Sequence, residues 1–240
     1  MTEKTLKILQ LYPRDMNIYG DWGNVLSLSR RAHAHGLATE IVDYNPGDIF
    51  PEDFDILVGG GGQDSGQTVI QDDLHRIAPV LRSAAESGAP MLVICGLYQL
   101  FGNQFTTVGG EVLQGIGLFD AHTVGSEERL IGNIVIESEE FGTIVGYENH
   151  SGLTYLGDGV ERLGTVTKGE GNNLDDDGEG ARVHHVIGSY LHGSLLPKNP
   201  RISDYLVRHA AERKFGSFEP ARIDDSSADH AREVAASRPR

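Results

Sequence analysis

The sequence predicts an α/β protein whose mainly parallel sheet is flanked by helices and extended by antiparallel strands. In the first 102 residues, short apolar runs alternate with helical patterns, in the order strand, helix, strand, strand, helix, strand, helix. After residue 102 the strand-like segments are short and are separated by glycines, which is typical of antiparallel ribbons. Since no linker or repeat divides the chain, we expect residues 1–217 to form a single domain.

Each element of the first half has its own signal. Ile70, Leu74, Ile77 and Leu81 recur at helical spacing and predict a long amphipathic helix that ends at Gly88. The continuous apolar run at 91–94 is typical of a strand that is buried on both faces. Further strands are expected at 6–12, 39–44 and 54–58, a further helix at 25–35, and a short helix at 97–101.

The second half is expected to be mostly strands. Strand-like segments occur at 109–113, 129–136, 143–147, 163–168 and 182–187, and a last helix follows Asn199-Pro200. The acidic segment 169–180 is turn-rich and is interpreted as a solvated hairpin tip. From residue 218 the chain is polar with few apolar anchors, so we expect a disordered C-terminal tail over 218–240.

Composition narrows the class of function. The formal net charge of −15 argues against nucleic acid as a partner, because phosphates need Lys and Arg to neutralise them. A single cysteine excludes an intrachain disulfide, and the absence of a disulfide is consistent with a protein of the reducing cytoplasm. We find no signal-peptide pattern and no apolar run long enough to span a membrane.

Cys95 is the strongest candidate for chemistry. It follows a buried strand and precedes a short helix, so it is expected on a sharp turn at the carboxyl end of a strand, where open α/β sheets bind ligands. The helix N-terminus would favour the thiolate, and the Gly96 amide would face an oxyanion formed on a group that Cys95 attacks. The alternative is that Cys95 is a small buried hydrophobic residue.

A thiolate nucleophile also needs a base, and the chain offers two histidines that follow strands. His192 ends the apolar run 186–191, and His150 follows the segment 143–147. We favour His192 only slightly on spacing alone. The four glycines at 59–62 also follow a strand, and they either let the backbone approach a ligand or form a flexible turn.

Taken together, these motifs resemble a known family. The segment Cys95-Gly96-Leu97-Tyr98-Gln99 resembles the nucleophile turn of class I glutamine amidotransferases, whose fold is flavodoxin-like. Residues 189–193 are similar to the histidine motif of the CobB/CobQ-like branch, and residues 59–63 are similar to its oxyanion loop. Over residues 6–215, the order of segments is similar to the glutaminase subunits of lipid II isoglutaminyl synthases.

The resemblance implies roles for single residues. Cys95 would be the nucleophile, and His192 would be the general acid and base. Backbone amides of Gly96 and of Gly61 or Gly62 would hold the oxyanion, and Gln99 would support the site. Arg129 matches the family's glutamine-binding arginine; its alternative is a surface ion pair with the neighbouring glutamates 127 and 128.

The resemblance also implies a partner. Glutamine hydrolysis would supply ammonia to a Mur-ligase-like chain of the MurT type in a heterodimer. That chain would amidate the D-glutamate α-carboxylate of lipid II to D-isoglutamine in peptidoglycan biosynthesis. No cofactor is expected in this chain, and ATP and Mg²⁺ are expected on the partner, because no ATP-binding motif occurs here.

Two positions depart from the family pattern, and at one of them Leu97 replaces a glycine of the common nucleophile motif. Many class I enzymes carry a glutamate two residues after the histidine, where this chain has Ser194. Glu148 or a carboxylate of the partner chain is the hypothesised substitute. Two alternative functions stay open: a cysteine hydrolase that acts alone, and a non-catalytic regulatory member of the same fold.

Overall fold

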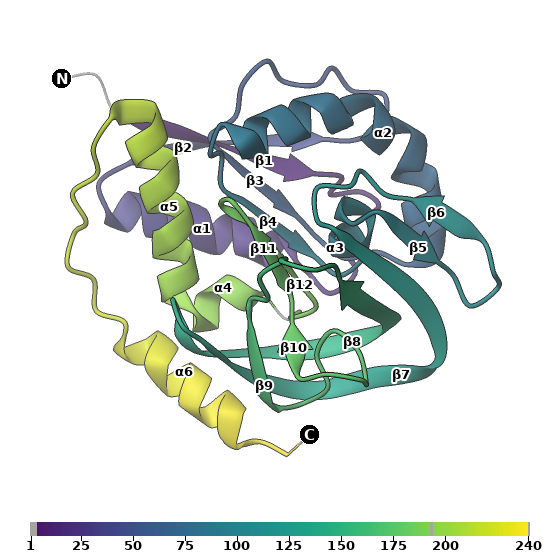
Figure 1. The fold of residues 1–240 in the computed structure, drawn as a ribbon. Coiled ribbons are helices and arrows are strands. Elements are labelled where there is room, and N and C mark those ends of the chain that lie inside the picture. Colours follow the sequence, from purple (N-terminus) through teal and green to yellow (C-terminus); the bar gives the residue numbers. More distant parts are fainter. Residues whose placement is uncertain (1–3, 193, 240) are drawn as a thin grey trace.

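The computed structural model describes residues 4–192 and 194–239, which form two sheets covered by helices (Figure 1). The first sheet has the strand order β11-β12-β4-β3-β1-β2, and only its edge strand β11 is antiparallel. Its strands are β1 (Thr5–Leu11), β2 (Ala38–Tyr44), β3 (Ile56–Gly59), β4 (Met91–Ile94), β11 (Ala181–Val183) and β12 (Val186–Ser189). The predicted mainly parallel sheet is therefore confirmed.

The crossovers of this sheet run in opposite directions from its centre. From β1 the chain moves outward through α1 (Trp22–Ala34) to β2, whereas from β3 it moves the other way through α2 (Asp64–Glu86) to β4. Because such crossovers are right-handed, α1 and α2 cover opposite faces (Figure 1). The order of the parallel strands is that of flavodoxin-like sheets, with the switch point between β1 and β3.

The helices follow the predicted apolar stripes. In α2 the buried residues include Ile70, Leu74, Ile77 and Leu81, and the helix ends next to Gly88, whose φ of 83° is easily adopted by glycine. The remaining helices are α3 (Gly96–Phe101), α4 (Leu195–Lys198), α5 (Pro200–Phe215) and α6 (Ser226–Ser237). Among the described residues, no helix has both the length and the apolar character that crossing a bilayer requires.

The second sheet is the predicted antiparallel extension, but its main strands are longer than expected. The segments expected at 129–136 and 143–147 lie within two strands of 18 and 15 residues that pair along their length. The sheet consists of β5 (Gln104–Thr106), β6 (Val112–Gln114), β7 (Ala121–Ser138), β8 (Gly142–Leu156), β9 (Gly164–Lys168) and β10 (Gly178–Glu179). The pairing of β7 with β8 shifts register between Gly125 and Leu130, so four residues of β7 bulge out of the ladder.

The acidic segment 169–180 is not the solvated hairpin tip that its composition suggested. Asn172 and Asn173 are buried, and the Asn173 amide donates to the Thr154 carbonyl at 2.9 Å. The Asn172 amide donates to the Gly180 carbonyl at 3.0 Å. Only residues 174–177 at the tip are exposed, because Asn173 binds the loop to β8 and Asn172 ties the start of the loop to its end.

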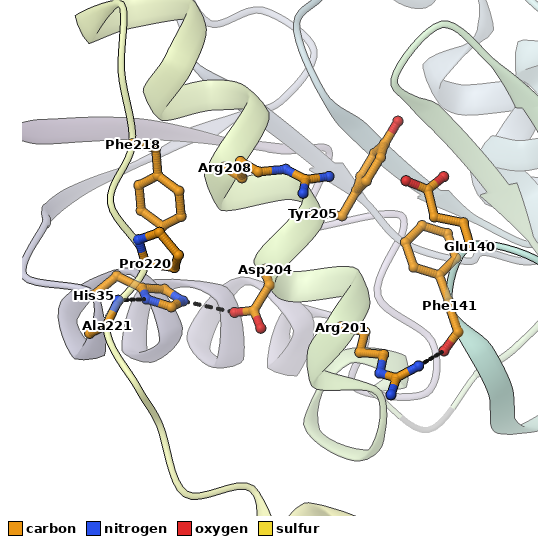
Figure 2. A pocket seen from close by; sticks show the side chains of 10 residues that line it. All are labelled: His35, Glu140, Phe141, Arg201, Asp204, Tyr205, Arg208, Phe218, Pro220 and Ala221. Atoms are coloured by element: carbon orange, nitrogen blue, oxygen red, sulfur yellow. Dashed lines mark hydrogen bonds and ion pairs between the residues drawn. The ribbon is translucent and has the colours of Figure 1, made fainter.

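The C-terminal segment also differs from the expected disordered tail. Residues 226–237 form α6, which contacts α4, β7 and β8, although none of its residues is fully buried. Before α6, the amide of Ala221 donates to Nδ1 of His35 at 3.1 Å, and Phe218 packs edge-on against the same ring. Figure 2 shows this segment closing one side of a cavity of about 410 Å³ beside α5. The sequence did not predict this structure, because the segment is held by a few scattered contacts and not by a periodic apolar stripe.

Candidate active site

A cavity of about 390 Å³ opens at the carboxyl ends of the parallel strands, on the side of the switch point between β1 and β3. The loops after β1, β3 and β4 form one wall, and the β7–β8 ribbon forms the opposite wall. Its lining includes Ile18, Tyr19, Gly62, Gln63, Cys95, Gln99, Arg129, Asn149 and His150. Cys95, Gly62 and Arg129, which the sequence singled out separately, therefore line one cavity.

Cys95 lies on the sharp strand-to-helix turn that the sequence predicts. Its φ of 50° and ψ of −104° are unfavourable for a residue with a side chain, and the surrounding hydrogen bonds hold it there. The Cys95 amide donates to the Ser189 carbonyl at 2.8 Å, and the Gln99 amide donates to the Cys95 carbonyl at 2.9 Å. Neighbouring strand β12 and helix α3 thus fix the thiol at the cavity floor.

His192 and Cys95 meet above the glycine loop. A Cβ atom on Gly61 would lie 2.6 Å from Cε1 of His192 and 3.1 Å from Cβ of Cys95, so only glycine leaves room for both side chains. The His192 backbone pairs with Tyr147 of β8, with its amide donating to the Tyr147 carbonyl at 2.7 Å. Residue 193, which follows His192 in the predicted motif, lies outside the described residues.

Asp21 completes the arrangement, and the sequence did not identify it. It is buried, and its Oδ1 lies 3.3 Å from Nδ1 of His192, so that Nδ1–H donates to the carboxylate. Its Oδ2 accepts the Gly61 amide at 2.7 Å. Asp21 stands at the N-cap position of α1, yet its side chain makes no capping hydrogen bond, because its two oxygens are bound to His192 and Gly61. The one sequence feature that could have indicated Asp21 as a site residue is its position in the loop after β1, a strand that borders the switch point.

Neighbouring groups stabilise the protonated, positively charged form of the His192 ring. Burial alone would lower the pKa of His192, but the negative charge of Cys95 and the hydrogen bond to Asp21 outweigh burial and raise the pKa to about 10. The ring nitrogen Nε2 is buried and has no hydrogen-bond partner among the described residues. With Nδ1 held by Asp21, Nε2 is the nitrogen left for proton exchange at the thiol.

Glu148, the hypothesised replacement for the missing acid, lies elsewhere. Its carboxylate accepts the backbone amides of Glu170 and Gly171, the latter at 2.9 Å. The carboxylate that lies against Nδ1 of His192 is that of Asp21. The Glu148 hypothesis is therefore wrong: the Glu148 side chain binds the backbone of the 170–171 segment and not the His192 ring.

His150, the rival base, is among the residues that line the cavity, whereas His192 is fully buried behind them; His150 is held as a neutral ring. Its Nδ1–H donates to the Gly152 carbonyl at 2.8 Å, and its ring stacks on Tyr190 with centroids 3.6 Å apart. Burial lowers the pKa of His150 to about 3. The choice between the two histidines depends on the Asp21 contact, which spacing could not reveal.

The family resemblance implies Gly61 or Gly62 as the glycine-loop donor to the oxyanion, and the structure leaves only the Gly62 amide for that role. The Gly61 amide already donates to Asp21, so it is not directed toward an oxyanion at Cys95. Gly62 lines the cavity, and its nitrogen lies 3.1 Å from where a Cβ of Gly96 would stand. Gly62 and Gly96 therefore remain the predicted oxyanion pair.

Gln99 supports the turn from below through a buried hydrogen-bond chain. Its Oε1 accepts from Nε2 of Gln67 at 2.7 Å, and its Nε2 donates to the Tyr190 hydroxyl at 3.1 Å. Gln67 also donates to the Gly96 carbonyl at 3.0 Å, which ties α2 to the first residue of α3. Gly152 leaves the space for Gln99, because a Cβ there would lie 2.2 Å from the Gln99 amide nitrogen. The sequence analysis did not identify Gln67, because a glutamine near the start of an amphipathic helix is typical of an exposed position.

Arg129 lies in the four-residue bulge of β7 and faces the cavity rather than the flanking glutamates. Its Nε donates to Oδ1 of Asn149 at 2.7 Å, and its Nη2 donates to the Tyr19 hydroxyl at 3.4 Å. Across residues 4–192 and 194–239, the structure has no ion pair between Arg129 and a carboxylate, so the surface ion pair considered above is not formed. A guanidinium held only by neutral oxygens keeps its charge available for an anionic ligand.

Glu179 is a buried carboxyl beside the end of β12, the strand that leads into His192. It accepts the Tyr190 amide at 2.7 Å and the Ser189 hydroxyl at 3.2 Å. Burial nevertheless raises the pKa of Glu179 to about 8, because these hydrogen bonds only partly offset the loss of solvation. Between pH 4.5, the ordinary pKa of a glutamate in the unfolded chain, and about pH 8, Glu179 therefore keeps its proton in the folded protein and releases it on unfolding.

This proton gives a prediction for stability against pH. A carboxyl whose pKa is raised on folding contributes stability at low pH that is lost as pH rises through about 8. Between pH 6 and pH 9 the free energy of unfolding of the wild type should fall by about 3 kcal/mol more than that of Glu179→Gln, which cannot ionise. Urea unfolding of both proteins across this range measures the difference, and parallel pH profiles would contradict the assignment.

Comparison with known proteins agrees with this geometry. Residues 7–200 match the CobB/CobQ-like glutamine amidotransferase domain. The GatD subunit of lipid II isoglutaminyl synthase (glutamine-hydrolyzing) from Staphylococcus aureus strain N315 is 42% identical over 230 residues, which cover 95% of this chain and 94% of that protein. The same-named subunit from Streptococcus pneumoniae is 37% identical, over 88% of this chain and 82% of that protein.

Solved structures support the fold. The structure of PurLQS from Thermotoga maritima contains a chain that superposes with a TM-score of 0.60 at 16% identity, covering 87% of this chain and 97% of that one. A glutamine amidotransferase from the same organism gives 0.55 at 14% identity, covering 96% and 93%. The expected class I amidotransferase fold is thus confirmed. From its domain match and its relatives, this chain belongs to the CobB/CobQ-like glutamine amidotransferase family.

Proposed function

We propose that this chain is the glutaminase subunit of a lipid II isoglutaminyl synthase. It hydrolyses L-glutamine to glutamate and ammonia and delivers the ammonia to a ligase partner. One observation carries the proposal: a thiol on a strained turn lies beside a charged, carboxylate-held imidazole in a cavity that also presents Arg129. The two GatD relatives support the choice of pathway.

In the first half of the reaction, the Cys95 thiolate attacks the carbonyl carbon of the glutamine side-chain amide. The negative oxygen of the tetrahedral intermediate lies between the amides of Gly62 and Gly96. Nε2–H of His192 then gives its proton to the departing nitrogen, ammonia leaves, and a γ-glutamyl thioester remains on Cys95.

In the second half, neutral His192 takes a proton from water, which attacks the thioester carbonyl. Collapse of this intermediate expels the thiolate and releases glutamate, and His192 is again the imidazolium. Asp21 keeps Nδ1–H of the ring directed away from the thiol throughout, so that the same nitrogen, Nε2, serves both proton transfers.

Arg129 selects the substrate in this proposal. Its guanidinium, on the opposite wall from the glycine loop, pairs with the glutamine α-carboxylate and leaves the side-chain amide to reach Cys95. The cavity volume of about 390 Å³ is within the usual range for small-molecule sites.

The ammonia passes to a Mur-ligase-like partner of the MurT type. That partner uses ATP and Mg²⁺ to activate the D-glutamate α-carboxylate of lipid II, and the product is D-isoglutamine in the peptidoglycan precursor. The proposal includes a cytoplasmic location, where a reduced thiol persists.

Isotope transfer tests this proposal. The chain, its ligase partner, ATP, Mg²⁺ and lipid II are incubated with glutamine carrying ¹⁵N in its side-chain amide, and the stem peptide is analysed by mass spectrometry. We expect ¹⁵N in the amidated product and one glutamate released for each amide formed. Glutamate release without transfer to lipid II would identify a hydrolase that acts alone. Absence of both glutamate release and transfer would identify a non-catalytic member.

A further inference from the structure

Tyr19 bridges the two walls of the cavity. It lies in the loop between β1 and α1, and its hydroxyl accepts a hydrogen bond from Nη2 of Arg129 at 3.4 Å. Its ring meets the His192 ring edge-on, with centroids 4.7 Å apart and an interplanar angle of 74°. One side chain therefore contacts both the arginine and the imidazole of the proposed reaction, through different groups.

The loop that carries Tyr19 is tied down on both sides. The Ile18 amide donates to the Gly61 carbonyl at 3.0 Å, so the residue before Tyr19 is bound to the glycine loop. The Ser194 hydroxyl donates to the Gly20 carbonyl at 3.2 Å, which binds the residue after it. Tyr19 is still 38% exposed, so its ring forms part of the cavity rim rather than of the core.

The charges around Arg129 indicate what the tyrosine hydroxyl does. Within the described residues, the polar partners of the guanidinium are the Asn149 amide oxygen and the Tyr19 hydroxyl. Both are neutral acceptors, which orient a guanidinium without neutralising it. A carboxylate in place of Tyr19 would compete with the substrate, whereas phenylalanine would leave one N–H of Arg129 to water.

We propose that Tyr19 is a positioning residue for substrate selection: its hydroxyl aims Arg129 at the α-carboxylate of a glutamine-like ligand, and its ring covers His192. The inference rests on the proposed function, because it assigns Arg129 a carboxylate ligand. The two roles belong to different parts of the side chain, so different substitutions separate them.

Labelling of Cys95 by two electrophiles tests the inference without requiring turnover. 6-Diazo-5-oxo-L-norleucine carries the α-carboxylate of glutamine, whereas iodoacetamide has no carboxylate. Rates of modification by each are measured by mass spectrometry on the full chain with its ligase partner. Their ratio reports recognition of the carboxylate and cancels changes in thiol reactivity.

In Tyr19→Phe, which keeps the ring, the ratio should fall about three- to tenfold, as expected for loss of one hydrogen bond. The iodoacetamide rate should stay within about twofold of wild type. In an Arg129→Lys background, Tyr19→Phe should change the ratio no further, because its effect acts through the guanidinium. Tyr19→Ala, which also uncovers His192, should in addition shift the pH profile of the iodoacetamide reaction.

An unchanged ratio in Tyr19→Phe would overturn the inference. If both labelling rates fall by the same factor, the hydroxyl has a general structural role; if neither rate changes, it has no role in labelling. Failure of the proposed function looks different: the diazoketone would not label Cys95 in the wild type, and the assignment of Tyr19 would fall with it.

Discussion

Replacement of Cys95 by alanine is expected to lower glutamine hydrolysis by about 10⁴-fold or more, because no other group in the cavity forms the thioester. The fold should survive, since the side chain is small and its backbone hydrogen bonds to Ser189 and Gln99 do not involve the thiol. Glutamate release by the complex with the ligase partner measures the loss.

Ammonium chloride provides the control for this variant. The partner should still amidate lipid II when ammonia is added directly, because Cys95→Ala removes only the source of ammonia. Loss of amidation under these conditions would indicate a damaged complex, and glutamine turnover at the wild-type rate would remove Cys95 from the mechanism.

Asp21→Asn is expected to lower kcat for glutamine hydrolysis by about 10²- to 10⁴-fold with little change in KM. The asparagine fits the same space, but it no longer supplies the negative charge that stabilises the imidazolium. It also permits the tautomer with the proton on Nε2. Because Asp21 accepts the Gly61 amide as well, the variant retains an acceptor for the glycine loop.

Glu148→Gln is the matched control for this prediction. Glu148 is equally buried, but it binds the 170–171 backbone, so its replacement should affect stability and not kcat. A near wild-type kcat for Asp21→Asn in the complex would contradict the assignment. It would favour the earlier alternative that the orienting carboxylate comes from the partner chain.

Periodicity and glycine placement predicted much of the fold, because these signals are local. The strand at 91–94 and the turn at Cys95 are where apolar continuity and Gly96 placed them. The same signals gave β7 and β8 too short and missed α6. Polar residues interrupt these elements, and they are held by pairing across the sheet and by contacts with distant segments.

The sequence by itself indicated Cys95 as the candidate nucleophile and determined the edge of the sheet where it lies, since parallel strands bring their carboxyl ends together. Only the tertiary structure decided the orienting acid, the available amide of the glycine loop and the orientation of Arg129. Asp21 and His192 are 171 residues apart, and Arg129 reaches the cavity only through a register shift between two strands. Such contacts depend on how elements pack in space, and no local spacing encodes them.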